Sequence, residues 1–451
     1  MVQKIPKRVS TAILQSLGAG VVPRTGAEHI AVGRKLEIEA LLHDLDDVIS
    51  EGGATFRLIV GRYGSGKSFL LQLIRNYAFQ RNFVVADADL SPQRRLTGSK
   101  NQGLALYREL LNNMATRTRP DGNAFAALLE RWISSIHSEV MNNGVSPSSP
   151  KFATLVEQKI HATVNEIEGM IHGFDFAAVI NAYWNGHQSG NDELKGAALR
   201  WLRGEFNTKA EARQALNVRV IIDDESWYDY IKLMAYFVRH IGYEGLVLFI
   251  DEAVNLYKIS HTVSRNNNYE RLLSIFNDTL QGKAEYLGVL IGATPQMVED
   301  TRRGLFGYEA LKTRLEESRF AREGLRDMTG PLIRLDVLNH SEVYVLLQTI
   351  RDIHQLHYGY ESSVDDRQIR AFMNEVLNRI GADTLLTPRE VVRDFVALLN
   401  MLYQHSDETF DSLVGELEFT AAKPYVDPEA LTPETEIHDD NEESPYSSFE
   451  I

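Results

Sequence analysis

Five runs of apolar residues, each followed by polar residues or a turn, stand out along the chain. They lie at 56–60, 83–90, 245–252, 286–294 and 331–338. Between them, many apolar residues recur at the spacing that is typical of helices. Strands that are continuously apolar and separated by helices favour a parallel sheet with helices on both faces. The pattern therefore predicts an α/β fold of three layers, αβα, with the parallel sheet in the middle.

The spacing of these strands is uneven. Segment 91–245 separates the second strand from the third, whereas a parallel crossover needs only one helix. Its pattern is helical, and it holds all four tryptophans of the chain. We interpret it as a large helical insertion. Two roles stay open for it: ordinary core, or a surface that binds a partner or DNA.

The chain after the fifth run has two parts. Residues 339–405 have a helical pattern with a break at Leu386–Arg389, and from about 421 the chain becomes rich in proline and acidic residues. A segment of that composition cannot bury enough apolar surface to fold. We divide the chain into an N-terminal segment (1–29), an α/β core with the insertion (30–338), a C-terminal helical bundle (339–420) and an acidic tail that we expect to be disordered (421–451).

Composition and charge narrow the class of protein. The chain is 44% hydrophobic and has no cysteine, which excludes disulfides and thiolate metal sites. No apolar run approaches the roughly 20 residues of a membrane-spanning helix, and residues 1–20 lack the apolar core of a signal peptide. We therefore expect a cytoplasmic protein without membrane contact.

The acidic charge is concentrated at one end. The net charge is −15, and residues 424–451 contain nine acidic residues and no lysine or arginine, so the rest of the chain carries −6. This balance argues against non-specific nucleic-acid binding by the whole surface, although it leaves room for a local basic channel.

The first apolar run leads into GRYGSGKS, Gly61–Ser68, which fits the phosphate-loop pattern G-x-x-x-x-G-K-[ST]. Glycines at these positions let backbone N–H groups converge on phosphates, and the following helix adds its positive end. The lysine of this motif reaches the β- and γ-phosphates, and its hydroxyl residue ligates Mg²⁺. We therefore predict ATP and Mg²⁺ as cofactors and the following binding residues: Gly61, Gly64, Ser65, Gly66, Lys67 and Ser68.

Two acidic residues end the third apolar run. Phosphoryl transfer needs a carboxylate that organises Mg²⁺ and a group that orients the attacking water. We assign Asp251, with Ser68, to the Mg²⁺ shell and Glu252 to the water; the alternative is that the two acids only cap the next helix. Thr294, which ends the fourth run, is placed to bond the γ-phosphate or the water, although threonine at a strand end is usually a helix cap.

Three other features suggest weaker candidates. Arg34, before the first predicted helix of the core, is a candidate for a residue that flanks the nucleotide base. His354 and His357 have a spacing that suits a metal, but no third ligand stands at a fixed distance, which favours a structural role. Gln93–Arg95 with Lys100 forms a basic patch, for which nucleic-acid contact and solvated loop charge both remain open.

In this order the motifs resemble those of the AAA+ superfamily, in particular its origin-recognition branch. IAVGRKLEIEAL (30–41) is similar to the box before the phosphate loop, LVLFIDEA (246–253) to the second nucleotide motif and LGVLIGAT (287–294) to the first sensor. TPREVVRDF (387–395) is similar to the second-sensor helix and places Arg389 at its arginine position. The resemblance implies that residues 339–420 form a helical lid.

Other segments resemble the ATP-binding proteins of BREX-type bacterial phage-defence loci. They are 18–34, 56–78, 86–96 and 118–122, and the resemblance covers most of residues 10–405. It implies an ATPase that acts in anti-phage defence beside a helicase-like or other protein of the same operon. Our hypothesis is that the ATPase acts on DNA or on a DNA-bound partner.

The AAA+ resemblance also implies a homo-oligomer in which an arginine of one subunit completes its neighbour's ATP site. Segment 308–320 lies where such arginines are found, and we choose Arg314, with Arg319 second. The resulting hypothesis is an ATPase with the catalytic residues Glu252, Asp251, Thr294, Arg314 and Arg389. The alternative is an ATP-dependent assembly switch or scaffold that hydrolyses ATP very slowly.

Overall fold

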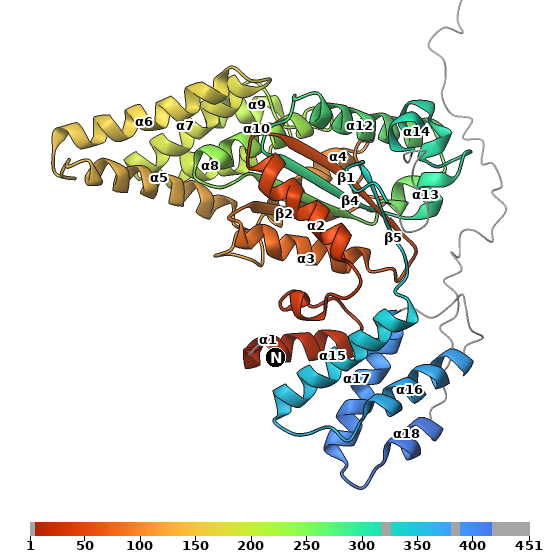
Figure 1. Cartoon of the computed structure of the whole chain (residues 1–451). Coiled ribbons are helices and arrows are strands. Elements are labelled where there is room, and N and C mark those ends of the chain that lie inside the picture. The colour runs from red at the N-terminus through yellow and green to blue at the C-terminus, as the bar shows by residue number, and fades with distance from the viewer. Residues whose placement is uncertain (1–4, 317–325, 380–387, 417–451) are drawn as a thin grey trace, which may run out of the picture.

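The computed structural model describes residues 5–316, 326–379 and 388–416 and contains a five-stranded sheet (Figure 1). Every strand pair is parallel, and the strand order is β2-β3-β4-β1-β5. The strands are β1 (Ala54–Gly61), β2 (Val84–Asp89), β3 (Leu246–Asp251), β4 (Leu287–Ala293) and β5 (Leu332–Leu335). The predicted α/β class and its parallel sheet are confirmed, and each strand lies within one of the five apolar runs or overlaps it.

Helices cover both faces of the sheet because the strands are apolar on both sides. Leu58 of β1 packs into one buried cluster and its neighbour Ile59 into another, and both are fully buried. The second cluster includes α2 (Lys35–His43), η2 (Asp44–Ile49) and α3 (Lys67–Gln80), and the first includes α10 (Trp227–His240) and α12 (Thr262–Leu280).

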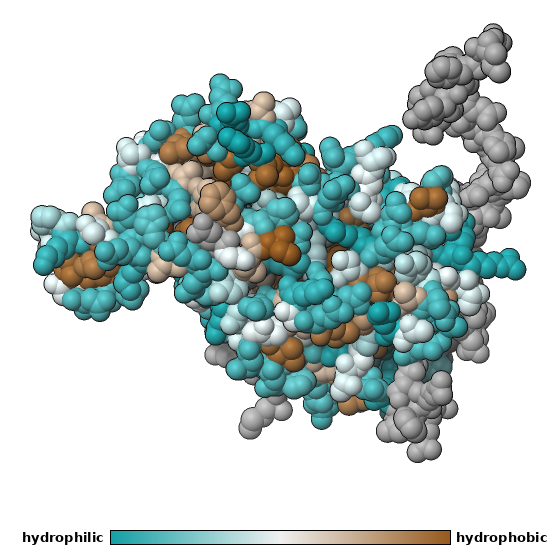
Figure 2. All heavy atoms as spheres, turned by 90° about the horizontal axis from the view of Figure 1, so that it is seen from above, coloured by the Kyte–Doolittle hydropathy of each residue, from teal (hydrophilic) through white to brown (hydrophobic). Residues whose placement is uncertain are grey.

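The segment between β2 and β3 consists largely of helices. Of these, α5 (Phe125–Asn142), α6 (Pro150–Glu168) and α7 (Gly173–Ser189) extend away from the sheet in Figure 1. The tryptophans of this segment are buried in the same cluster as one face of the sheet, which makes them core residues. From above, the visible face is mainly hydrophilic with separate apolar patches (Figure 2). The helices before α10 are α4 (Gln102–Asn112), α5 (Phe125–Asn142), α6 (Pro150–Glu168), α7 (Gly173–Ser189), α8 (Asp192–Leu202) and α9 (Lys209–Leu216), and the buried tryptophans are Trp132, Trp184, Trp201 and Trp227.

The C-terminal helices form a bundle with its own apolar cluster, and the N-terminal helix α1 (Lys7–Gly18) belongs to it. Ile13 of α1 is fully buried there, and Figure 1 shows α1 beside α15 and α17. The division of the chain at residue 29 stays a prediction, but residues from both ends of the chain share one core. The bundle contains α15 (His340–Tyr358), α16 (Asp366–Arg379), α17 (Pro388–Gln404) and α18 (Phe410–Glu416).

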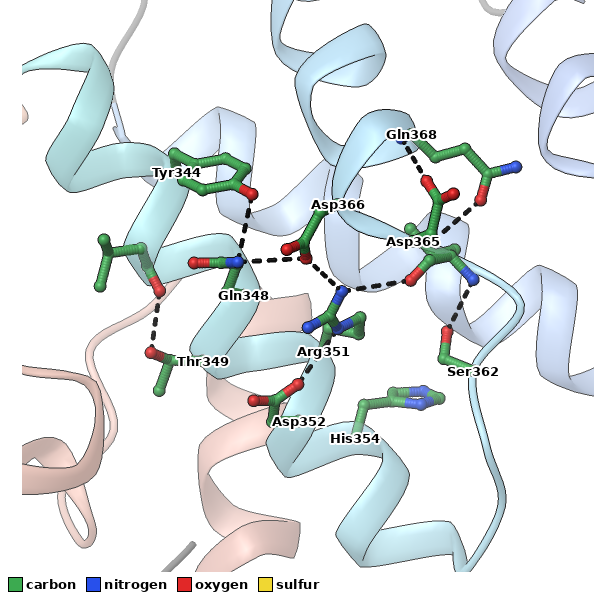
Figure 3. Close-up of polar contacts among 12 residues, drawn as sticks. Tyr344, Gln348, Thr349, Arg351, Asp352, His354, Ser362, Asp365, Asp366 and Gln368 are labelled. Carbon is green, nitrogen blue, oxygen red and sulfur yellow. Dashed lines mark hydrogen bonds and ion pairs between the residues drawn. The ribbon is translucent and has the colours of Figure 1, made fainter. Parts of the chain in front are cut away.

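A polar network fastens α15 to the start of α16 (Figure 3). Arg351 Nη1 donates to Asp366 Oδ1 at 2.9 Å and to the carbonyl oxygen of Val364 at 3.3 Å. Gln348 Nε2 donates to the same Asp366 oxygen at 3.1 Å. The bundle is therefore held by directional bonds as well as by apolar packing.

The two histidines of the HQLH segment have structural partners. His354 is fully buried, and its ring nitrogens lie 2.9 Å from Tyr360 Oη and 3.1 Å from Asn400 Oδ1. His357 Nδ1 lies 2.9 Å from Ser10 Oγ of α1. Among the residues that the structure describes, no group of three or more His, Asp or Glu side chains is arranged to hold a metal ion.

Some predictions fall outside the described ranges. They concern Leu386 and Thr387 at the predicted break, Arg319, and the acidic tail 421–451. Within the described ranges, no helix combines the length and apolar character that crossing a membrane requires.

Candidate functional site

The predicted phosphate loop joins β1 to α3, and its glycines are required by the backbone. Gly64 has a φ of +79° and Gly66 a φ of +90°, which are values that residues with a side chain rarely adopt. A side chain at Gly61 would collide with Ser65 Oγ and come within 3.2 Å of the Leu335 carbonyl oxygen. The conformation of the loop therefore depends on glycine at these positions.

Lys67, the first residue of α3, lies folded over the loop. Its Nζ donates to the carbonyl oxygen of Gly61 at 2.9 Å and to that of Arg62 at 3.2 Å. Burial lowers the pKa of the Lys67 ammonium, and the nearby carboxylates of Asp251 and Glu252 oppose that shift. This places a cation between the loop and the acidic ends of the sheet.

Ser68 and Asp251 are adjacent although 183 positions separate them in the chain. Ser68 Oγ donates to Asp251 Oδ2 at 2.6 Å. Strand β4 lies between β1 and β3, and Gly292 on it leaves room for the carboxylate, since a side chain there would collide with Asp251 Oδ1. A hydroxyl and a carboxylate oxygen are ligands that Mg²⁺ prefers, so this pair fits the predicted metal.

Glu252 has an unusual backbone conformation. Its φ is +57°, in the left-handed region, which costs a non-glycine residue roughly 1–2 kcal/mol. Its N–H donates to Asp251 Oδ1 at 2.8 Å, and the residue lines the cavity. Strain of this kind persists only where the surroundings impose it and is frequent at functional sites.

The pKa of the Glu252 carboxyl is raised, first by burial and then by the negative charges of Asp251 and Asp89. Asp89 is paired in register with Asp251 on the neighbouring strand, and burial and Asp251 raise the pKa of Asp89 too. Sequence reasoning did not single out Asp89, although its place at the end of an apolar run gives the same signal as that of Asp251.

The raised pKa of Glu252 predicts how the ATPase activity depends on pH. If Glu252 acts as a base it must be ionised, so the acid limb of kcat/KM for ATP lies above the ordinary glutamate pKa. Asp89→Asn removes one negative charge, lowers the pKa of Glu252 and moves that limb to lower pH. A pH profile of both proteins measures the shift; a limb that stays in place or moves upward would contradict the assignment of the base.

A cavity of about 800 Å³ opens beside these groups, within the range of small-molecule sites. The phosphate loop, Asp251 and Glu252 line one end of it. Apolar residues from segment 21–32, from the connection after β5 and from the C-terminal bundle line much of the rest. We call these residues the apolar wall of the cavity; they are Val21, Val22, Pro23, Ile30, Val32, Leu338, Leu346 and Val392. The sequence analysis did not predict the apolar wall, because single aliphatic residues that are scattered along the chain form no recognisable motif.

Arg34 lies behind the phosphate loop. One guanidinium nitrogen donates to the carbonyl oxygen of Ser65 at 2.9 Å and to that of Asp336. The side chain is 7% exposed, and burial lowers its pKa. Arg34 lines the cavity, and its guanidinium bonds the backbone of the phosphate loop. The sequence analysis predicted a position beside the nucleotide base and did not predict this contact with the loop.

Thr294 and Arg389 also line the cavity. Thr294 Oγ1 accepts the N–H of Met297 at 3.3 Å and caps α13 (Pro295–Glu299), which is the structural alternative that the sequence left open. Arg389, in the first turn of α17, donates to Tyr63 Oη of the phosphate loop at 3.1 Å, and its guanidinium lies over the Tyr63 ring.

Arg314 is not brought to this cavity within one chain. It lies in the last turn of α14 (Glu309–Leu315), where its guanidinium donates to Asn277 Oδ1 at 3.2 Å and to the Ala310 carbonyl oxygen at 2.7 Å. Arg314 is not among the residues that line the cavity.

Comparison with known proteins identifies one family. The model for the BREX system ATP-binding protein BrxC/D matches residues 5–418. No curated protein matches the chain. The family match spans the α/β core, the insertion and the described C-terminal helices.

Proposed function

This chain belongs to the BREX system ATP-binding protein BrxC/D family, and on that basis we propose that it binds Mg-ATP at Gly61–Ser68 and hydrolyses it in bacterial anti-phage defence. The observation that carries the proposal is the 2.6 Å contact between Ser68 Oγ and Asp251 Oδ2 at the phosphate end of the cavity. It joins two oxygen ligands of the predicted Mg²⁺ to the loop that would hold the phosphates.

Each residue at the phosphate end of the cavity has its own role in this proposal. Lys67 exchanges its contacts with the loop carbonyls for the β- and γ-phosphates, and Ser68 and Asp251 hold Mg²⁺. The metal neutralises charge on the phosphate oxygens when it is bound. Glu252 orients the attacking water and accepts its proton, and Thr294 bonds the γ-phosphate or that water.

The C-terminal bundle acts in this proposal as an AAA+ lid. Arg389 extends from α17 to the phosphate loop. A bond from Arg389 to the γ-phosphate would couple the position of the lid to the presence of ATP. The apolar wall of the cavity, which residues of the N-terminal segment and the bundle share, suits the nucleotide base. Opening of the lid would then expose the base and release ADP.

We further propose a homo-oligomer in which Arg314 of one subunit completes the ATP site of the next. Arg314→Ala and Glu252→Gln proteins should each be inactive. A mixture should regain part of the ATPase activity, because some interfaces pair an intact Glu252 with an intact Arg314, and the gain should rise with protein concentration. No recovery although the subunits exchange, or full activity of Arg314→Ala alone, would rule out this role.

The proposed partners are DNA and a helicase-like or other protein of the defence operon, in the cytoplasm. Steady-state phosphate release with and without duplex and single-stranded DNA tests the proposal. Turnover that exceeds one ATP per subunit and responds to DNA or to the partner supports an ATPase that drives the complex. Binding of ATP that assembles the complex without such turnover would instead identify the chain as an assembly switch.

A further inference from the structure

A side chain outside the cavity bonds the backbone of Glu252, the residue with the left-handed conformation. Asn255 is the second residue of α11 (Val254–Tyr257), a short helix that follows the Asp251–Glu252 pair. Its Nδ2 donates to the carbonyl oxygen of Glu252 at 3.2 Å and to that of Leu90 at 2.9 Å. Its own N–H donates to the same Glu252 oxygen at 3.0 Å. Asn255 thus closes the turn around Glu252 with two donors.

The second bond of Nδ2 connects this turn to the neighbouring strand. Leu90 follows β2 directly, and its N–H donates to the Asp251 carbonyl oxygen at 3.0 Å. The carbonyl oxygen of Leu90 is bonded by Asn255. Leu90 is therefore bonded both to Asp251, the residue before Glu252, and to Asn255, the residue that closes the turn. Rotation of the Glu252 backbone would disturb these bonds.

The backbone strain at Glu252 gives this restraint its importance. Glu252 has a left-handed φ of +57°, which a non-glycine residue rarely adopts. Strain of this kind favours rotation of the Glu252 backbone out of the left-handed conformation. A clamp on the carbonyl oxygen of the same residue opposes that rotation without occupying the space in which a water and the γ-phosphate would lie.

We propose that Asn255 is a positioning residue for hydrolysis, which rests on the proposed function of Glu252. Asn255 does not line the cavity and acts through Glu252. Because displacement of a reacting group by about 1 Å can cost about 100-fold in rate, loss of the clamp lowers kcat and leaves nucleotide binding intact.

Asn82 offers a matched control on the same pair of strands. It precedes β2, at the opposite end of the sheet, and it too has a positive φ, of +62°. Its Nδ2 donates to the Gly242 carbonyl oxygen at 2.9 Å, and its carbonyl oxygen accepts the N–H of Glu244, so it joins the start of β2 to the turn before β3. Asn82→Ala therefore removes a comparable clamp far from the candidate site.

The test compares Asn255→Ala, Asn82→Ala and the wild type in steady-state phosphate release, nucleotide affinity and thermal unfolding. Asn255→Ala should lower kcat by about 10- to 100-fold, with KM and nucleotide affinity within about twofold, whereas Asn82→Ala should keep the wild-type kcat. Asn255→Asp, which keeps the shape but loses the Nδ2 donor, should show the same loss and serves if the alanine variant does not fold.

A wild-type kcat in either folded Asn255 variant would overturn the inference, and so would an equal loss of kcat in Asn82→Ala. Absence of turnover in the wild type would instead contradict the proposed function, so the two failures are distinguishable.

Discussion

Lys67→Ala is expected to abolish binding of Mg-ATP. The Nζ of Lys67 donates to two loop carbonyl oxygens at the phosphate end of the cavity, where the phosphates of ATP would take their place. Hydrogen bonds from an ammonium to phosphate oxygens contribute roughly 3 kcal/mol or more together, so the loss in affinity should be at least about 100-fold.

Equilibrium titration with a fluorescent ATP analogue, together with the shift in melting temperature at saturating Mg-ATP, measures this loss. Lys151→Ala is the control, since Lys151 is exposed on α6, away from the cavity. It should bind like the wild type. Unchanged affinity in folded Lys67→Ala would refute the assignment of the phosphate loop.

Glu252→Gln should bind Mg-ATP at least as tightly as the wild type and lose its turnover. The amide has the same size but cannot accept a proton from water, and loss of a general base typically costs about 10²- to 10⁴-fold in rate. Binding survives because Lys67, Ser68 and Asp251 are unchanged. It should even strengthen, since the substitution removes repulsion between Glu252 and its carboxylate neighbours Asp251 and Asp89.

Phosphate release and nucleotide affinity should be measured on the same preparation of this variant. Glu193→Gln, an exposed change on α8, should leave both unchanged. If Glu252→Gln turns over at the wild-type rate, another group activates the water, and Asp89, the carboxylate in register with Asp251, becomes the first candidate.

The sequence predicted what depends on local pattern. Within Ala54–Gln80, a strand, a glycine-rich turn and the start of a helix follow one another, and each has a pattern of consecutive residues. The phosphate loop could therefore be located from the sequence alone. The α/β class follows from the repetition of such patterns. The family, too, was recognised from contiguous segments, and the match over residues 5–418 confirms it.

What the sequence did not show depends on contacts between distant residues. Ile13 of α1 joins the core of the C-terminal bundle only because the chain returns to it more than 300 residues later. Arg34 was predicted beside the base, but its bonds to Ser65 and Asp336 depend on where β5 ends. No sequence motif pointed to Asn255, because its bonds to Leu90 and Glu252 depend on the register between β2 and β3.

Single-turnover phosphate release is the most direct test of the proposal that this chain is a Mg²⁺-dependent ATPase. Purified protein in excess over radiolabelled ATP should release phosphate with Mg²⁺ and release none when EDTA replaces the metal, and Glu252→Gln should retain the label as bound ATP. Phosphate release that persists in EDTA or in Glu252→Gln, or a wild type that binds Mg-ATP and never cleaves it, would contradict the proposal.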